Sequence, residues 1–151
     1  MNDNPLRMLM IDDSEQDALV IIRELERDGS HPLYERVETA DAMKKALQKH
    51  QWDMILCDSN LQKFDAFSAI AVLNESNIDI PLVLISGSAG EDTAVEYMRA
   101  GAKDFITKGN LSRLCPAVDR ELKDADFRKK QKQAESKLQQ TVDNLRKAIG
   151  T

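Results

Sequence analysis

Three aspartates stand at the ends of two apolar segments of the sequence. Asp12 and Asp13 follow the apolar residues 8–11, and Asp58 follows the apolar residues 54–57. Continuous apolar runs of this kind are typical of strands that are buried on both faces of a parallel sheet. Ligands of such sheets bind beyond the carboxyl ends of the strands, so we expect the three carboxylates to meet in one crevice. They would repel one another without a hard cation between them, and Mg²⁺ is the usual one.

A hydroxyl and an ammonium group stand at the ends of two further apolar segments. Ser86 ends the segment 81–86, and Lys108 comes directly after the segment 104–107. A carboxylate can accept a phosphoryl group, which makes Asp58 the candidate nucleophile. Phosphoryl transfer depends mainly on positioning and on neutralising the charge of the transferred oxygens. Ser86 and Lys108 are the side chains that suit this second task.

The predicted metal site draws on the same strand ends. We expect Asp13 and Asp58 to hold Mg²⁺, Asp12 to contribute through a water, and the backbone carbonyl of Asn60 to complete the protein ligands. Taken singly, each of these residues is explained as well by a helix cap or a turn. Four strand ends that carry acid, acid, hydroxyl and ammonium in chain order have no explanation in packing, and this combination indicates chemistry.

The elements that must position these groups alternate along the chain. Five strands are expected at residues 7–11, 33–37, 52–58, 81–86 and 104–107. Helices are expected between them and after them, at residues 14–28, from Thr39 onward, 66–74, 91–99 and from about 111. This alternation predicts an α/β fold: a doubly wound, flavodoxin-like, five-stranded parallel sheet in the order 2-1-3-4-5, with helices on both faces.

Helical spacing also predicts which side chains face the core. In the first helix the expected set is Ala18, Leu19, Ile22 and Leu25. In the helix near residues 66–74 it is Phe67, Ile70, Ala71 and Leu73.

The region after about residue 119 differs in composition. It is highly charged and contains neither Gly nor Pro before Gly150. Apolar and small residues recur there with heptad spacing, alternating steps of four and three. These positions are Phe127, Gln131, Ala134, Leu138, Thr141, Leu145 and Ala148. The pattern fits either a solvated extension of the last core helix or a signalling helix that pairs in a dimer, and we favour the second.

Composition narrows the class of protein further. The chain has 151 residues and a net charge of −5, which disfavours general nucleic-acid binding because that needs a basic face. No segment has the apolar length that would span a bilayer. Cys57 and Cys115 fit no metal-ligand spacing and are expected to be unpaired, which points to a reduced, cytoplasmic protein.

Four segments carry a resemblance to a known family. They read MLMIDDSEQDA, WDMILCDSNL, PLVLISGSAGED and GAKDFITKGNL, and they begin at residues 8, 52, 81 and 101. Together they make residues from about 7 to 122 resemble the receiver domain of two-component response regulators. The resemblance assigns residues 1–122 to a receiver domain and leaves residues 123–151 as a helical linker or coiled-coil signalling helix.

The resemblance also implies roles for individual residues. It makes Asp58 the phosphoacceptor, Asp12 and Asp13 the acidic Mg²⁺ pocket, and Lys108 the lysine that contacts the phosphoryl group. Ser86 is then the hydroxyl switch residue. Phe105, three residues before the lysine, stands at the aromatic switch position.

Two further positions are expected to tune the reaction. Asn60 and Ser88 lie two residues beyond the acceptor and the switch hydroxyl, and exchanging them is expected to change the hydrolysis rate modestly. Gly109 stands where the family usually has a proline after the lysine.

The resemblance implies partners as well. A receiver takes its phosphoryl group from a sensor histidine kinase or a phosphotransfer protein, and relays a conformational change through its last helix. The final residues, 137–151, look like linkers that precede HD-GYP phosphodiesterase, PAS, kinase or cyclase domains, which implies a downstream output domain. A homodimer through the helix is the alternative outlet, and neither a nucleic acid nor a membrane is expected as a partner.

Other classes of protein fit the sequence less well. A haloacid dehalogenase-type enzyme would carry a second acid two residues after the nucleophile, where this chain has Asn60. A flavodoxin-like cofactor binder would need a hydroxyl- and glycine-rich phosphate loop where this chain has Asp12 and Asp13. An interaction module that is no longer phosphorylated would have no need of the five polar strand-end groups. We therefore expect no stand-alone enzyme, only a domain that catalyses its own phosphorylation and dephosphorylation.

Overall fold

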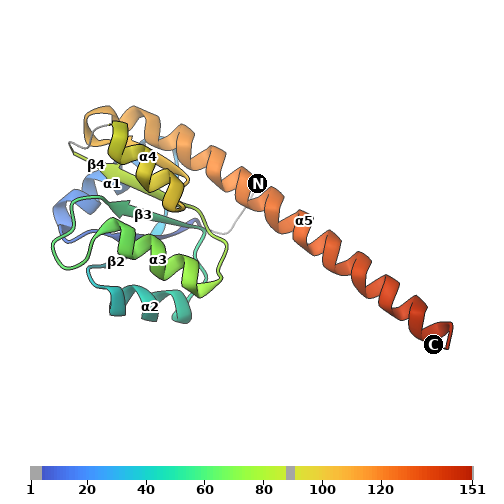
Figure 1. The fold of residues 1–151 in the computed structure, drawn as a ribbon. Helices are drawn as coiled ribbons and strands as arrows, with labels where there is room; N and C mark the ends of the chain where they lie inside the picture. Colours follow the sequence, from blue (N-terminus) through green and yellow to red (C-terminus); the bar gives the residue numbers. More distant parts are fainter. Residues whose placement is uncertain (1–4, 88–90, 151) are drawn as a thin grey trace.

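Five parallel strands form one sheet at the centre of the protein, with helices on both faces (Figure 1). The computed structural model describes residues 5–87 and 91–150. The strands are β1 (Arg7–Ile11), β2 (Leu33–Val37), β3 (Met54–Asp58), β4 (Leu82–Ser86) and β5 (Asp104–Thr107). Their order, β2-β1-β3-β4-β5, confirms the predicted fold.

The helices cover the two faces of the sheet unequally. On one face α2 (Ala40–Lys49), α3 (Ala66–Ser76) and α4 (Glu91–Ala100) pack against the strands. On the other face α1 (Glu15–Arg27) packs beside the first turns of α5 (Leu114–Ala148). The strand side chains alternate between the two apolar clusters, as the period of a strand requires. The three inner strands are therefore apolar almost throughout.

Local signals set the helix boundaries. The Ser14 hydroxyl accepts the backbone N–H of Asp17, and the Thr39 hydroxyl accepts that of Ala42, so each side chain caps the helix that follows it. After α1, Gly29 has a φ of 87°, a conformation that glycine adopts without a steric penalty.

Two predicted core faces need correction. In α1, Ile21 is buried where Leu19 was expected, because the buried stripe is Ala18, Ile21, Ile22 and Leu25. In α3 the buried side chains are Ala66, Ala69, Ile70 and Leu73. Phe67 and Ala71 are instead exposed. In both helices the buried set follows i, i+3, i+4, i+7 spacing, from Ala18 and from Ala66, and neither Leu19 nor Phe67 fits that spacing.

The last helix begins later than predicted. Residues Lys108–Arg113 form a 3₁₀ turn, in which Asn110 has a non-helical backbone, and α5 starts at Leu114. Pro116 then lies in the first turn of α5, where its missing N–H leaves no hydrogen bond broken.

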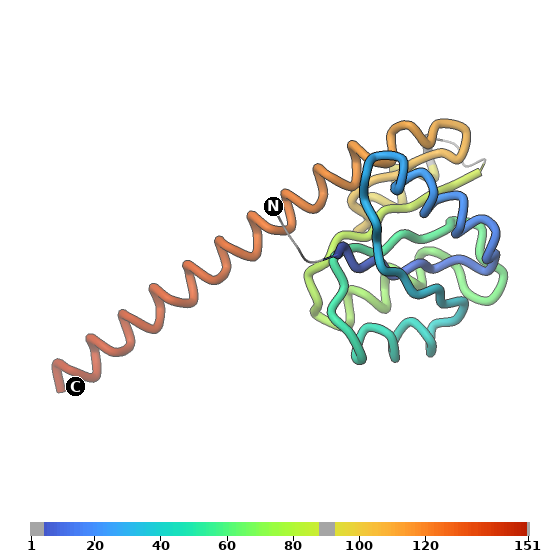
Figure 2. Tube along the Cα trace, turned by 180° about the vertical axis from the view of Figure 1, so that it is seen from behind, coloured from blue at the N-terminus to red at the C-terminus, as the bar shows by residue number. Residues whose placement is uncertain are grey.

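The distal part of α5 projects away from the rest of the molecule, and Figures 1 and 2 show this from opposite sides. The helix has 35 residues and no break. Only its first two turns bury side chains, ending at Glu121. Farther along, Phe127, Leu138 and Leu145 are 68%, 66% and 58% exposed. The heptad-spaced face therefore has no partner within the described chain.

Two further expectations from composition are tested by the structure. Cys57 and Cys115 form no disulfide, as predicted. No helix in the described ranges is both long and apolar enough to cross a bilayer. The 35-residue α5 is long enough but too rich in charged residues.

Candidate phosphoacceptor site

Asp12 lies at the carboxyl end of β1 and is almost completely buried, with 1% of its surface exposed. Its Oδ1 accepts the backbone N–H of Ser14 at 2.9 Å, whereas its Oδ2 has no hydrogen-bond partner among the described residues. Burial raises the pKa of Asp12 to about 6, and the nearby Asp58 carboxylate adds to the effect against the Ser14 hydrogen bond. This buried, unpartnered oxygen is suited to a cation.

Asp58 ends β3 beside Asp12. It is 5% exposed, and each of its two carboxylate oxygens has one partner. Oδ1 accepts the backbone N–H of Asn60 at 3.0 Å, and Oδ2 lies 3.3 Å from the Lys108 Nζ. The loop after the strand and the lysine after β5 thus hold the carboxylate from two sides.

Asp17 is a third member of this cluster that the sequence analysis did not identify. One oxygen from each of Asp12, Asp17 and Asp58 lies within 4.8 Å of the others. Asp17 occupies the third position of α1, from which an acidic side chain often returns to the backbone N–H of the capping residue. That N–H, of Ser14, donates to Asp12 instead. The Asp17 carboxylate is consequently available to the site, and it accepts from Lys108 at 3.3 Å.

Lys108 bridges the two acids. Its Nζ is 3.3 Å from both Asp17 Oδ2 and Asp58 Oδ2. Burial by itself would lower the pKa of Lys108, but the charge of Asp58 and the contacts with Asp17 outweigh it and raise the pKa. Lys108 therefore remains an ammonium group at neutral pH, next to the candidate nucleophile.

Asp13 and Asn60, two of the predicted metal ligands, lie around the cluster in different ways. The Asp13 Oδ2 accepts the backbone N–H of Gln62 at 3.1 Å, which ties β1 to the loop after β3. Asp13 is not one of the three acids that approach within 4.8 Å. Asn60 directs its backbone N–H to Asp58. Ligation by Asp13 and by the Asn60 carbonyl stays a prediction.

The two expected switch residues lie on neighbouring strands. Ser86 ends β4, is 2% exposed and pairs in register with Thr107 of β5. Phe105 is half-buried, and its ring centroid lies 6.3 Å from that of Tyr97 on α4. Tyr97 stacks in turn on Phe67 of α3 at 4.4 Å. Ser88, expected to tune hydrolysis, lies outside the described residues.

The arrangement is chemically coherent. Three carboxylates converge, one of their oxygens is buried without a partner, and one ammonium group balances part of the negative charge. Such a donor set fits Mg²⁺, which prefers a few carboxylate oxygens and keeps several waters. An acidic triad of this kind is typical of a receiver Mg²⁺ site, and it is consistent with a phosphoacceptor at Asp58.

Comparison with known proteins agrees with this geometry. Residues 8–119 match the response regulator receiver domain. The chain is 28% identical over 130 residues to a protein-glutamate methylesterase/protein-glutamine glutaminase of Rhodospirillum centenum, covering 85% of this chain and 31% of that protein. It is 29% identical over 106 residues to the cell cycle transcriptional regulator CtrA of Caulobacter vibrioides, covering 68% and 44%. The chain thus spans less than half the length of these two relatives.

Solved structures show the same fold. The signal receiver domain of a putative LuxO repressor protein from Vibrio parahaemolyticus superposes with a TM-score of 0.73 at 23% identity, covering 83% of this chain and 96% of that one. The receiver domain of NtrX from Brucella abortus gives a TM-score of 0.68 at 26% identity, covering 77% and 98%. With more than half of the chain matched, the protein belongs to the response regulator receiver domain family.

Proposed function

We propose that this protein accepts a phosphoryl group on Asp58 from the phosphohistidine of a sensor kinase or phosphotransfer protein. A carboxylate oxygen of Asp58 would attack phosphorus as the bond to the histidine nitrogen breaks and the imidazole leaves. The observation that carries the proposal is the 3.3 Å approach of Lys108 to the buried Asp58 carboxylate, inside a cluster of three acids.

Each residue of the site then has a task. Lys108 neutralises charge on a transferred oxygen, and the Asn60 N–H holds the Asp58 carboxylate in one orientation. Mg²⁺, when bound, would neutralise further phosphoryl charge, and Asp12, Asp13, Asp58 and the Asn60 carbonyl are the ligands that we propose for it. Asp17 is an additional candidate from the same cluster.

The response to phosphorylation would begin at β4 and β5. The Ser86 hydroxyl lies at the end of β4 and can donate to a phosphoryl oxygen after a small movement. The Phe105 ring stacks on the ring of Tyr97 in α4, so a change of the Phe105 rotamer would alter the packing of that helix. This is a local electrostatic event that biases an element with two packing states.

The outlet of the signal would be α5. It follows Lys108 after only the 3₁₀ turn of residues 108–113, and it continues without a break to Ala148. A shift at Lys108 would therefore move a rigid helix, which would transmit it to a second copy or to a downstream output domain. A protein with this role would work in the cytoplasm, where its kinase presents the phosphohistidine.

A homodimer through α5 fits the geometry of the helix. At about 100° per residue, the heptad-spaced face points roughly 140° away from the face that packs on the receiver body. A second helix can therefore lie along it without displacing the body, leaving residues 123–151 as a coiled-coil linker. Replacing Phe127, Leu138 and Leu145 together by serine should convert dimers to monomers in analytical ultracentrifugation. An unchanged mass would contradict this interface.

Beryllofluoride, a stable mimic of the phosphoryl group, tests the acceptor site. With Mg²⁺ it should shift the backbone NMR signals of Ser86 and Phe105 in the parent chain and leave them unchanged in Asp58→Ala. Asp41→Ala removes an exposed aspartate of α2 and serves as the matched control. No shift in the parent would instead favour a receiver-like interaction module that is no longer phosphorylated.

A further inference from the structure

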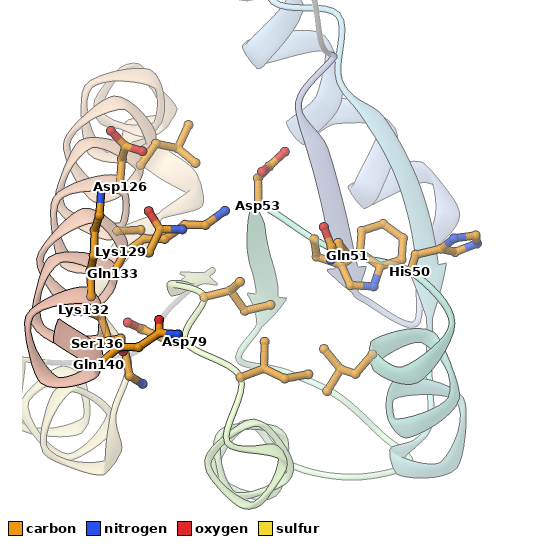
Figure 3. A pocket seen from close by; sticks show the side chains of 17 residues that line it. His50, Gln51, Asp53, Asp79, Asp126, Lys129, Lys132, Gln133, Ser136 and Gln140 are labelled. Carbon is orange, nitrogen blue, oxygen red and sulfur yellow. The ribbon is translucent and has the colours of Figure 1, made fainter. Parts of the chain in front are cut away.

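A groove lies on the far side of the molecule from the acidic cluster, between α5 and the edge of the sheet at which the strands begin (Figure 3). Its volume is about 1010 Å³, at the upper end of the range for small-ligand pockets. One wall is about five turns of α5, from Leu122 to Gln140, and the opposite wall includes Gln51 and Asp53. A straight helical wall of this length suits an elongated occupant.

The lining combines apolar and basic side chains. Leu47, Trp52, Ile78 and Ile80 supply apolar surface from the receiver body, and Ile78 is 40% exposed. Trp52 is fixed in place because its indole N–H donates to the Ala46 carbonyl at 2.9 Å. Apolar surface of this kind, open to solvent along a helix, is typical of a groove that receives an amphipathic segment.

The acidic and the basic side chains of the groove differ in whether they have partners. Its three acidic side chains each have a partner: Asp53 accepts the Arg7 backbone N–H, Asp79 binds Arg128, and Asp126 binds Lys130. Its three lysines have no ion pair among the described residues. They are Lys129, Lys132 and Lys137. The backbone N–H does not neutralise Asp53, so among the described residues three lysines without ion pairs face one carboxylate without an ion pair. The α5 wall of the groove is therefore positive, although the chain as a whole carries a charge of −5.

The groove is also held in shape. Arg128 of α5 contacts both carboxylate oxygens of Asp79, at 3.1 and 3.2 Å, and Asp79 precedes β4. This bidentate pair attaches the base of the projecting helix to the receiver body. An occupant would contact both walls at once, so its affinity would depend on the angle between α5 and the receiver body.

We propose that this groove binds an amphipathic helix of a partner protein. The apolar side of that helix would lie on Trp52, Ile78 and Ile80, and its acidic flank would face the α5 lysines. The proposal does not depend on phosphorylation at Asp58. Its occupant is defined by charge complementarity: an acidic helix is attracted to the three lysines, and a basic one is repelled.

Synthetic helical peptides of about four turns test the proposal. Two peptides would share one leucine face and differ only in glutamate or lysine at the flanking positions. Trp52 is the single tryptophan of the chain, so its emission reports occupancy of the groove directly. The acidic peptide should change the Trp52 emission in a saturable and salt-sensitive way, and the basic peptide should not.

A charge-reversal pair supplies the control. Lys129→Glu with Lys132→Glu should weaken the acidic peptide at least about tenfold, because two attractive contacts become repulsive. Lys44→Glu with Lys45→Glu on exposed positions of α2 alters the net charge equally and should leave binding unchanged. Equal binding of both peptides, no binding of either, or equal weakening by both pairs of substitutions would overturn the proposal. So would lysine-dependent binding to phosphatidylserine vesicles alone, or a Trp52 change that follows protein concentration alone.

Discussion

The carboxyl edge of the sheet and the distal half of α5 use charge in opposite ways. At the sheet edge Asp12, Asp58 and Lys108 are wholly or partly buried, and each contact is fixed by an element of the fold. In the distal helix the charges are exposed and the contacts are local, such as that of Asp143, which accepts the Gln139 side-chain N–H at 3.0 Å. Burying an ionic group is costly, so a cluster of buried acids beside an ammonium group is a candidate functional site.

Apolar groups show the same contrast. In the receiver body Ile21 is 3% exposed, whereas Leu138 on the distal helix is 66% exposed. An isolated helix gains little from its own backbone, so a 35-residue helix with an exposed apolar face is stable mainly through what lies against it. The apolar side chains of the receiver body are thus packed within the fold, whereas those of the distal helix are open to solvent in the described chain.

The largest difference in stability between the two regions should appear when one apolar side chain is truncated in each. Ile21→Ala should lower the free energy of unfolding by about 3 kcal/mol, through lost burial and a cavity. Leu138→Ala should change it by less than about 0.5 kcal/mol at protein concentrations too low for dimers. Urea unfolding followed by circular dichroism measures both. Equal costs would show that the distal helix packs on the body.

Removal of the Lys108 ammonium group should lower the rate of phosphorylation. Lys108→Ala should slow phosphorylation by acetyl phosphate roughly 100-fold, as expected for one lost charge contact to the transferred group. Lys103→Ala removes an exposed lysine just before β5 and is the matched control. A rate within a factor of about two of the parent would take Lys108 out of the reaction.

The buried Asp12 should make stability depend on pH. Its pKa in the folded protein is about 6 against 3.8 for an unperturbed aspartate, so the unfolded chain loses its proton first as pH rises. Without divalent cations this destabilises the fold progressively from about pH 4 to pH 6, by about 3 kcal/mol.

Asp12→Asn removes that charge. The variant should be more stable than the parent above pH 6, and the difference should shrink as pH falls toward 4. Mg²⁺ should stabilise the parent more than the variant, because the ion compensates the buried carboxylate. Urea titrations at several pH values, with and without Mg²⁺, measure this. A gap that does not vary with pH would mean that Asp12 does not titrate in this range.

The smallest effect should come from the ion pair that joins the two regions. Arg128 and Asp79 are 32% and 51% exposed in their side chains, so their coupling in a double-mutant cycle should stay below about 1 kcal/mol. Arg128→Ala should nevertheless increase amide hydrogen exchange in α5 near residues 123–130. Unchanged exchange there would mean that the pair does not hold the helix.

Sequence patterns predicted the sheet well because its signal is redundant. Each inner strand is apolar almost throughout and ends at a polar residue or directly before one, and hydroxyl side chains cap α1 and α2. Helix faces were harder. Leu19 and Ile21 are both apolar, but only Ile21 fits the i, i+3, i+4, i+7 spacing from Ala18 that the buried face follows, so the expectation for Leu19 departed from that spacing.

The sequence placed Asp12, Asp58 and Lys108 at one edge of the sheet, and the structure brings them together there, but it did not identify Asp17. Asp13 and Asp17 are both near the end of β1, but Asp13 bonds the Gln62 N–H and Asp17 bonds Lys108. Spacing along the chain does not determine such choices. One signal for Asp17 was available: its position in the first turn of a helix that starts at the strand end places it over the crevice.

Intact mass after incubation with acetyl phosphate and Mg²⁺ tests the central claim most directly. The parent chain should gain one phosphoryl group, the gain should disappear with a chelator, and Asp58→Ala should gain none. An adduct that persists in Asp58→Ala, or a folded parent that gains no mass at all, would contradict the account of Asp58 as the phosphoacceptor.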